Sequence, residues 1–392
     1  MSLEKRIALI RKIEALRGST VMAFLTGLRP GVIGNIADDS VRVFFDHLLK
    51  LPRRPVAKLD IFLCSNGGSG TVPWRLVSLF REFAKSFNVL IPYRAYSAAS
   101  LLALGADEIV MHPFAELGPI DPTVSNDFNP TDPRTSQRIG ISVEDVTAYV
   151  NFIKSTVGIT HEDELVQAVK ILVEKVHPLA LGNVERFLSQ SRMIAKKILN
   201  THTQTQDEHV IDEIVENMAS KLYFHGHPIN RKEAKNELKL KVNDELDAQL
   251  ENAMWQLYLL YEGEFQNTVS FNPAGDLAKV ALDQMEAWRK QVQGANTANP
   301  PSPPPSEAVV QYDLLHAMVE SSRVSSQMET TRRYTLTGQL QPGQPPMIRE
   351  DILKQGWSHS LVPAAPRQSV RRRSTSAGGA PKAGGNVSGA RE

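Results

Sequence analysis

The sequence predicts an α/β layered fold, because segments typical of strands alternate with segments typical of helices over residues 20–124. The strand-like segments are short and apolar, as in residues 21–25, whereas the helix-like segments carry apolar residues at helical spacing. Clusters of glycine, asparagine and serine separate the two kinds of segment. From residue 143 to residue 262 the pattern is mainly helical.

The predicted elements follow one another in a regular order. They are helix 1–19, strand 21–25, helix 36–51, strand 59–63, helix 72–87, a strand beginning at residue 89, helix 98–105 and strand 108–111. Residues 125–141 are polar and interrupted by prolines, so we expect an exposed loop there.

The composition changes sharply near residue 294, where a proline-rich stretch begins that cannot continue a helix. Residues 363–392 are rich in Ser, Gly, Ala and Arg and lack aromatic residues, so we expect disorder there. We therefore predict a domain over residues 1–245, a helical extension over 246–293, and a Pro-rich linker with a largely disordered basic tail over 294–392. The apolar face of helix 246–261 fits either a subunit contact or an internal core helix.

The overall composition is that of an ordinary soluble protein. A net charge of +1 gives no reason to expect a nucleic-acid partner, except for a weak signal from the Arg371-Arg372-Arg373 run in the tail. The single cysteine, Cys64, excludes a disulfide within the chain and a cysteine-built zinc site, and we expect it to be a small buried hydrophobe. No segment approaches the 18 or so apolar residues that span a bilayer, and residues 1–19 do not resemble an export signal, so we predict a cytoplasmic protein that does not enter a membrane.

Two short segments carry the chemistry. The first is Ser65-Asn66-Gly67-Gly68, where paired glycines after a strand allow positive φ angles and leave N–H groups pointing into open space. The second begins at Ser97, which lies between a strand and a helix of small residues, a position suited to nucleophilic attack. A serine at that position also commonly serves only as a helix cap.

The order and spacing of the two segments resemble the Clp-fold peptidases, and in particular the serine dehydrogenase proteinase family. Further matching segments are Gly27-Leu28-Arg29-Pro30, Ile36-Ala37-Asp38-Asp39, residues 117–122, residues 177–183 and residues 225–229, so the resemblance covers roughly residues 5–245. It implies a Clp/crotonase-like fold of repeated strand-strand-helix units, Ser97 as nucleophile, and an oxyanion hole from Gly67, Gly68 and Ala98. It also implies a peptide or protein substrate, a homo-oligomer, and neither a cofactor nor a metal ion.

The general base stays open at this stage. The resemblance implies Ser, Asp and His in that chain order, for which Asp121 and His177 are the best matches. Lys154 is the alternative base of a Ser–Lys dyad. His225, His227 and His112 are further candidates, and the first two lack a carboxylate or cysteine partner for metal binding.

Three functions remain in competition. The first is a serine peptidase that forms an acyl-enzyme on Ser97. The second is a catalytically impaired Clp-fold scaffold or peptide-binding protein, because the family pattern Ser-Ala-Gly-Thr reads Ser97-Ala98-Ala99-Ser100 here and Ala99 adds a methyl group. The third, an acyl-CoA enzyme of the crotonase type, is disfavoured by the serine at the nucleophile position.

Overall fold

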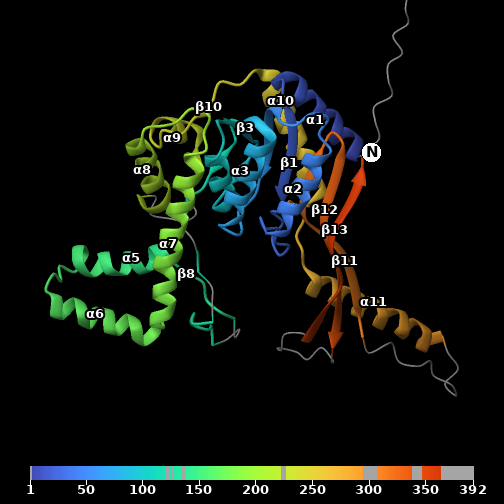
Figure 1. The fold of residues 1–392 in the computed structure, drawn as a ribbon. Coiled ribbons are helices and arrows are strands. Elements are labelled where there is room, and N and C mark those ends of the chain that lie inside the picture. Colours follow the sequence, from blue (N-terminus) through green and yellow to red (C-terminus); the bar gives the residue numbers. More distant parts are fainter. Residues whose placement is uncertain are drawn as a thin grey trace, which may run out of the picture. The chain divides into compact units, whose positions relative to one another are not determined.

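The structure is a computed structural model that describes residues 2–120, 123–124, 127–133, 137–221, 227–294, 307–337 and 347–362 (Figure 1). Residues 1–362 form one compact unit. The predicted disorder of residues 363–392 and the arginine run within them lie outside the described residues.

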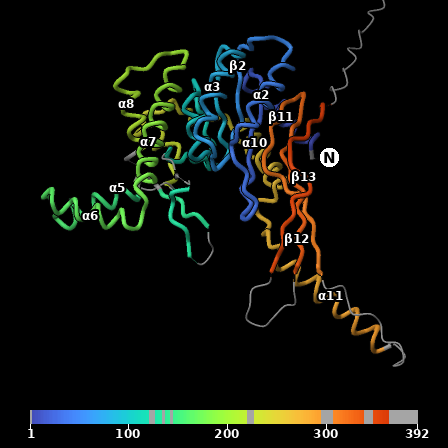
Figure 2. Tube along the Cα trace, turned by 60° about the horizontal axis from the view of Figure 1, so that its bottom comes forward, coloured from blue at the N-terminus to red at the C-terminus, as the bar shows by residue number. Residues whose placement is uncertain are grey.

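A sheet of eight strands runs through this unit in the order β10-β5-β3-β2-β1-β11-β12-β13. Its parallel part consists of β1 (Thr20–Thr26), β2 (Val56–Cys64), β3 (Ala84–Ile91), β5 (Glu108–Met111) and β10 (Val242–Asn243). Strand β1 and the second halves of β2 and β3 are nearly continuous apolar runs, which is typical of parallel strands covered on both faces. The other three strands, β11 (Val309–Ser321), β12 (Val324–Thr337) and β13 (Met347–Leu361), are antiparallel and run side by side as long neighbours (Figure 2).

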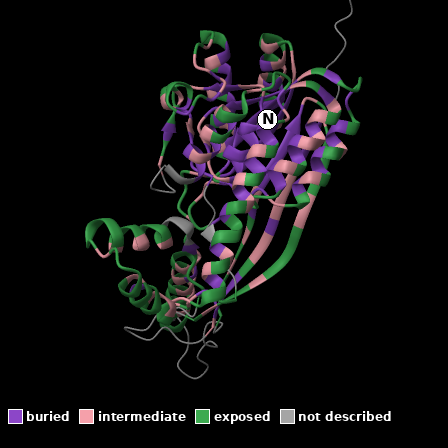
Figure 3. Ribbon diagram, turned by 60° about the vertical axis from the view of Figure 1, so that its left-hand side comes forward, coloured by how far each residue is buried: buried purple, intermediate pink, exposed green. Residues whose placement is uncertain are grey.

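Helices cover both faces of the sheet, as the alternation of side chains along β1 demonstrates. Met22 and Phe24 belong to one buried cluster, whereas Val21, Ala23 and Leu25 belong to another. The first cluster packs against α2 (Asp39–Leu49), α3 (Val72–Phe83), α4 (Ala98–Leu104) and α7 (Pro178–Leu199), and the second packs against α1 (Ser2–Arg17) and α10 (Ala248–Glu264). Figure 3 shows the buried residues concentrated where these helices meet the sheet.

Smaller elements complete the described residues. The short strands are β4 (Arg94–Ala95), β6 (Glu116–Leu117), β7 (Thr123–Val124), β8 (Ile141–Ser142) and β9 (Ile229–Asn230). The further helices are α5 (Val143–Asn151), the π-helix η1 (Phe152–Thr156), α6 (Glu162–Lys175), α8 (Glu208–Glu216), the π-helix η2 (Asn217–Lys221), α9 (Arg231–Asn236) and α11 (Pro273–Gly294).

The predicted α/β fold and the alternation of strands and helices up to residue 111 are confirmed. One boundary differs: α3 ends at Phe83, and β3 begins at Ala84, whereas we expected the helix to reach residue 87. The face of α10 with Leu250, Met254, Leu257 and Tyr261 is buried in the chain's own core, so the internal-helix interpretation holds for it.

The region after residue 294 corrects our expectation of a linker and a largely disordered tail. The described residues 307–337 and 347–362 form three strands of 13, 14 and 15 residues, and the first of them pairs with β1 in the central sheet. The proline-rich composition ends at Pro305, and the sequence that follows can form a hairpin around Ser322-Arg323. We also predicted a domain boundary at residue 245. The segments on its two sides share one core, because α10 packs on α1.

A buried ion pair ties this C-terminal hairpin to the N-terminal helix. Arg6 of α1 donates two hydrogen bonds, of 2.8 and 2.9 Å, to the two carboxylate oxygens of Glu320 in β11. Tyr261 of α10 and Ser325 of β12 donate hydrogen bonds to the same carboxylate. The carboxylate is therefore fully satisfied, as a buried charge requires.

Candidate functional site

Ser97 occupies a strained turn directly before α4. Its φ of 52° and ψ of −116° match the second residue of a type II′ turn, and the Ala99 N–H closes that turn by donating to the Tyr96 carbonyl at 2.9 Å. Glycine is the residue that ordinarily occupies this conformation, and holding a serine there costs on the order of 1–3 kcal/mol. Backbone strain at a serine between a strand and a helix is typical of a nucleophile turn.

The side chain of Ser97 is half-buried, and its hydroxyl makes no hydrogen bond to any residue in the described part of the chain. In particular, it does not cap α4, so the helix-cap interpretation of this serine is wrong. The hydroxyl is therefore free to contact a bound substrate.

Gly67 lies against this turn. A Cβ atom added to Gly67 would stand 2.8 Å from the Ser97 Cβ and 2.8 Å from the Tyr96 carbonyl oxygen, and its φ is +109°. The Gly67 N–H donates to the Ser65 hydroxyl at 3.0 Å, so it is already occupied. We expected the N–H groups of Gly67, Gly68 and Ala98 to form an oxyanion hole. The Gly67 N–H already has an acceptor, and Gly67 instead packs directly against Ser97.

The N–H of Gly68 points away from the segment around Ile36, with which Gly68 forms a parallel β-bridge. Ile36 donates its N–H to the Gly67 carbonyl and accepts the N–H of Ser69, both at 2.8 Å, so the Gly68 N–H faces the opposite side of this bridge. The N–H groups of Gly68 and of Ala98, the first residue of α4, have no acceptor among the described residues. Ala98 directly follows Ser97, and Gly68 follows Gly67, which lies against the Ser97 turn.

Ser100 connects the start of α4 to the segments that carry Ala95 and Gly118. Its buried hydroxyl lies 2.7 Å from both the Ala95 and the Gly118 carbonyl oxygens, and it accepts the Gly118 N–H at 3.2 Å. The segment that carries Leu117 also pairs with β4 through Ala95. Ser100 therefore keeps the Ser97 turn attached to the neighbouring segment.

Ala99, which motivated the hypothesis of an impaired enzyme, lies fully buried in the core cluster. Its added methyl group consequently contacts the protein interior and does not reach the surface beside Ser97. The substitution leaves the hydroxyl of Ser97 accessible.

The C-terminal strands support the loop that carries Ile36, a contact that sequence reasoning missed. His316 of β11 hydrogen-bonds the Ile33 carbonyl through Nδ1 and the Thr330 hydroxyl through Nε2, both at 2.8 Å. Gly34 packs so closely on β11 that a Cβ atom there would stand 2.0 Å from the His316 carbonyl oxygen. The sequence Gly34-Asn35-Ile36 did not predict this contact, because a glycine in such a setting is common in loops.

The candidate bases are not brought into hydrogen-bond contact with Ser97 within the described residues. His177 caps α7, where its Nδ1 accepts the Leu179 N–H at 3.1 Å, and its ring stacks on Phe128. His227 pairs with Glu233 at 2.7 Å, and His112 accepts the Phe114 N–H at 3.1 Å. Asp121 and His225 lie outside the described residues.

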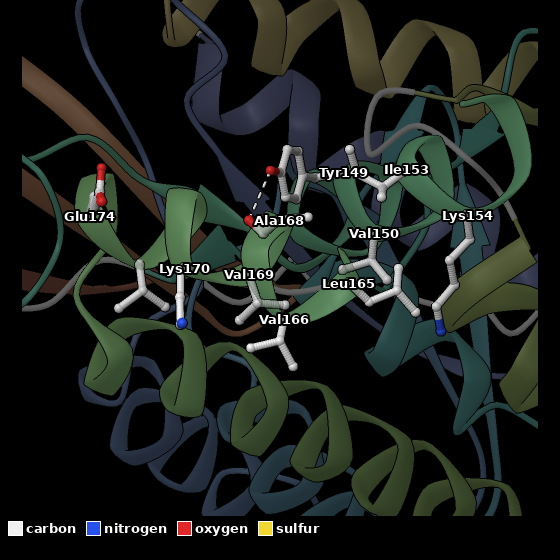
Figure 4. A pocket seen from close by; sticks show the side chains of 11 residues that line it. Tyr149, Val150, Ile153, Lys154, Leu165, Val166, Ala168, Val169, Lys170 and Glu174 are labelled. Atoms are coloured by element: carbon white, nitrogen blue, oxygen red, sulfur yellow. Dashed lines mark hydrogen bonds between the residues drawn. The ribbon is translucent and has the colours of Figure 1, made fainter. Parts of the chain in front are cut away.

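Lys154 stands on the exposed π-helix η1 and lines a groove of about 600 Å³ between η1, α5 and α6 (Figure 4). That groove is lined by residues 149–174 and contains none of the residues of the Ser97 turn. Lys154 therefore lines the groove between α5, η1 and α6.

The single cysteine lies in the protein interior. Cys64 is buried, and burial raises the pKa of its thiol to about 12, so it behaves as the expected small hydrophobe. In the described ranges, no three His, Cys, Asp or Glu side chains gather where they could hold a metal ion. No helix among the described residues is both long and apolar enough to cross a bilayer.

The chain resembles one protein family and several known proteins. Residues 1–153 match the family model described as ClpP-like SDH-type serine proteinase. An uncharacterised protein of Methanocaldococcus jannaschii is 32% identical over 127 residues, which cover 31% of this chain and 42% of that protein. The chain thus spans less than half of the length of this relative.

Two solved structures of the 1510-N membrane-bound stomatin-specific protease were also found. One variant shares 13% sequence identity with a TM-score of 0.31, over 57% of this chain and 79% of that chain. Another variant, in complex with a substrate peptide, shares 13% identity with a TM-score of 0.34, over 57% of this chain and 74% of that chain.

Proposed function

Because residues 1–153 carry the family signature of the ClpP-like SDH-type serine proteinases, we propose that this chain is a serine endopeptidase with Ser97 as its nucleophile. The observation that carries the proposal is the strained turn at Ser97, whose hydroxyl makes no hydrogen bond in the described part of the chain. The N–H of Ala98, next to it, and the N–H of Gly68, which follows the closely packed Gly67, likewise have no acceptor there. Backbone strain is retained where function needs a fixed geometry.

The reaction follows from these groups. The Ser97 hydroxyl oxygen attacks the carbonyl carbon of the scissile peptide bond while a general base accepts its proton. The negative charge that develops on the carbonyl oxygen accepts hydrogen bonds from the N–H groups of Gly68 and Ala98. The C–N bond then breaks, the amine leaves with the proton from the base, and water releases the acyl group from Ser97 by the reverse sequence.

For the general base we propose the family pattern of Asp121 and His177, with Lys154 as the alternative. Asp121 directly follows Ile120, in the segment that Ser100 attaches to the nucleophile turn through Gly118. Alanine substitution at each of the three positions distinguishes them, because loss of the base removes about 10²–10⁴-fold of the rate. A homo-oligomer and a cytoplasmic location remain predictions from the sequence.

The test is hydrolysis of quenched fluorescent peptides by the full chain and by Ser97→Ala. We expect turnover by the wild type and none by the variant. Equal turnover by the two proteins would assign the activity to a contaminant or to another residue.

The second candidate is the non-catalytic scaffold. It is favoured by one observation, the lack of a base bonded to Ser97 within the described residues. Peptide binding without hydrolysis by the wild type would support it and would overturn the peptidase proposal.

A further inference from the structure

A small cavity lies at the carboxyl end of α4, where the loop between α7 and α8 packs on the turn between α4 and β5. Its volume is about 10 Å³, which is close to the least that holds one water molecule. Most of its lining is apolar, with Leu104 and Ile109 among the side chains. Its polar lining comes from His202, Gln206 and Lys241.

Two of these lining residues each carry a buried polar atom that has no hydrogen-bond partner among the described residues. The atoms are Nδ1 of His202 and Oε1 of Gln206. His202 as a whole is only 9% exposed, so bulk solvent does not replace the missing partner. Buried polar atoms in folded proteins are nearly always hydrogen-bonded, so two such atoms at one cavity indicate a bound molecule that serves both.

The ring of His202 accepts a hydrogen bond at Nδ1. Its Nε2 lies 2.7 Å from the Leu104 carbonyl oxygen, and a carbonyl oxygen only accepts, so Nε2 carries the proton. Burial lowers the pKa of His202, which keeps the ring neutral and leaves the lone pair on Nδ1. The molecule that serves Nδ1 is therefore a hydrogen-bond donor.

Oε1 of Gln206 is also an acceptor, so the bound molecule donates two hydrogen bonds at once. Water does this within the volume of the cavity. Water also fits a reversed Gln206 amide, because it accepts from an N–H as readily as it donates to an oxygen. A cation is disfavoured, because Lys241 already brings a positive charge to the lining.

We propose that one water molecule is bound in this cavity and bridges Nδ1 of His202 and Oε1 of Gln206. The water fixes the ring whose Nε2–H holds the carbonyl of Leu104, the last residue of α4. Through it, the loop between α7 and α8 anchors the helix that begins directly after Ser97. The inference is independent of the peptidase activity, because none of the lining residues belongs to the Ser97 turn.

A crystal structure of the full chain, at a resolution that shows ordered waters, tests the site directly. We expect one density peak at hydrogen-bond distance, about 2.7–3.2 Å, from both His202 Nδ1 and Gln206 Oε1. Absence of density there overturns the inference. So does a direct hydrogen bond between the two side chains, or a peak with the coordination of a metal ion.

A double-mutant cycle tests the bridge in solution, measured as the equilibrium constant of unfolding in urea titrations. Gln206→Leu leaves His202 Nδ1 without its bridge, so we expect it to raise the unfolding constant about tenfold. His202→Leu raises it further, because this variant also loses the hydrogen bond to Leu104. The double variant falls about fivefold short of the product of the two single effects, because one bridge is lost only once.

Gln204→Leu is the matched control, since it makes the same substitution two residues away, at an exposed position outside the cavity lining. We expect it to leave the unfolding constant at the wild-type value. Single effects that multiply fully in the double variant contradict the bridge. An effect of Gln204→Leu as large as that of Gln206→Leu contradicts it as well.

Discussion

Replacing Gly67 by alanine tests whether the close approach of this glycine to Ser97 sets the geometry of the site. The new Cβ atom would stand 2.8 Å from the Ser97 Cβ, 2.8 Å from the Tyr96 carbonyl oxygen and 3.2 Å from the Ala98 nitrogen. Real Cβ contacts are rarely closer than 3.4 Å, so the Ser97 turn must move by about 0.6 Å or more. The φ of +109° adds a strain of on the order of 1–3 kcal/mol.

A displacement of this size is enough to affect the chemistry, because a shift of about 1 Å in a reacting group costs on the order of 10²-fold in rate. We therefore expect Gly67→Ala to lower the second-order rate of fluorophosphonate labelling by about 10²-fold. Thermal unfolding of the same variant measures the strain separately from the loss of reactivity.

Gly70→Ala is the matched control, since Gly70 lies in the same loop and has no atom within 4 Å of an added Cβ. We expect it to label at the wild-type rate. The reasoning is refuted if Gly67→Ala labels as fast as the wild type, or if Gly70→Ala is slowed to the same extent.

Three further expectations concern the groups that support the sheet and the loop. Glu320→Ala removes two hydrogen bonds from the buried Arg6 guanidinium and leaves Glu264 as a remaining carboxylate partner, so the free energy of unfolding falls by about 1.5–3 kcal/mol in urea titrations, and Glu320→Gln loses less. An equal loss in the two variants would contradict this. Burial lowers the pKa of His47 from 6.5 to about 4, so its stabilising contribution is complete above pH 6.5 and is lost as the pH falls towards 4. Urea titrations at pH 7 and 4.5 should show that His47→Gln removes about 2 kcal/mol of this pH dependence, and an unchanged slope would count against it. His316→Leu removes the hydrogen bond to Ile33 and slows fluorophosphonate labelling about tenfold, whereas His316→Asn, whose amide N–H can replace Nδ1–H, recovers most of the rate. Equal rates in the two His316 variants would show that this hydrogen bond does not position the loop.

Local patterns were sufficient to predict strands β1, β2, β3 and β5 of the sheet and the turn between a strand and a helix at Ser97. The apolar runs of β1, β2 and β5 and the small residues after Ser97 carry their information within a few neighbouring positions. The two glycines were identified together with Ser97, but the sequence could not say which of their N–H groups remains free. That depends on the Ser65 hydroxyl, which occupies the Gly67 N–H.

Contacts between distant segments could not be predicted in this way. Strand β11 follows a proline-rich stretch, and it pairs with β1 at a place where Arg6 and Glu320, which are 314 residues apart, form a buried ion pair. His316 supports the loop of Ile36 through a contact that neither segment reveals alone. Residue spacing likewise suggested Lys154 as a base but could not show that it lines the groove between α5, η1 and α6.

Mass-spectrometric mapping of a fluorophosphonate adduct tests the central claim most directly, because it reports which atom of the chain is nucleophilic without assuming a substrate. We predict one adduct per chain, located on Ser97, and no adduct on Ser97→Ala. The absence of an adduct on the folded wild type, or an adduct on another serine, would contradict the assignment of Ser97 as the nucleophile.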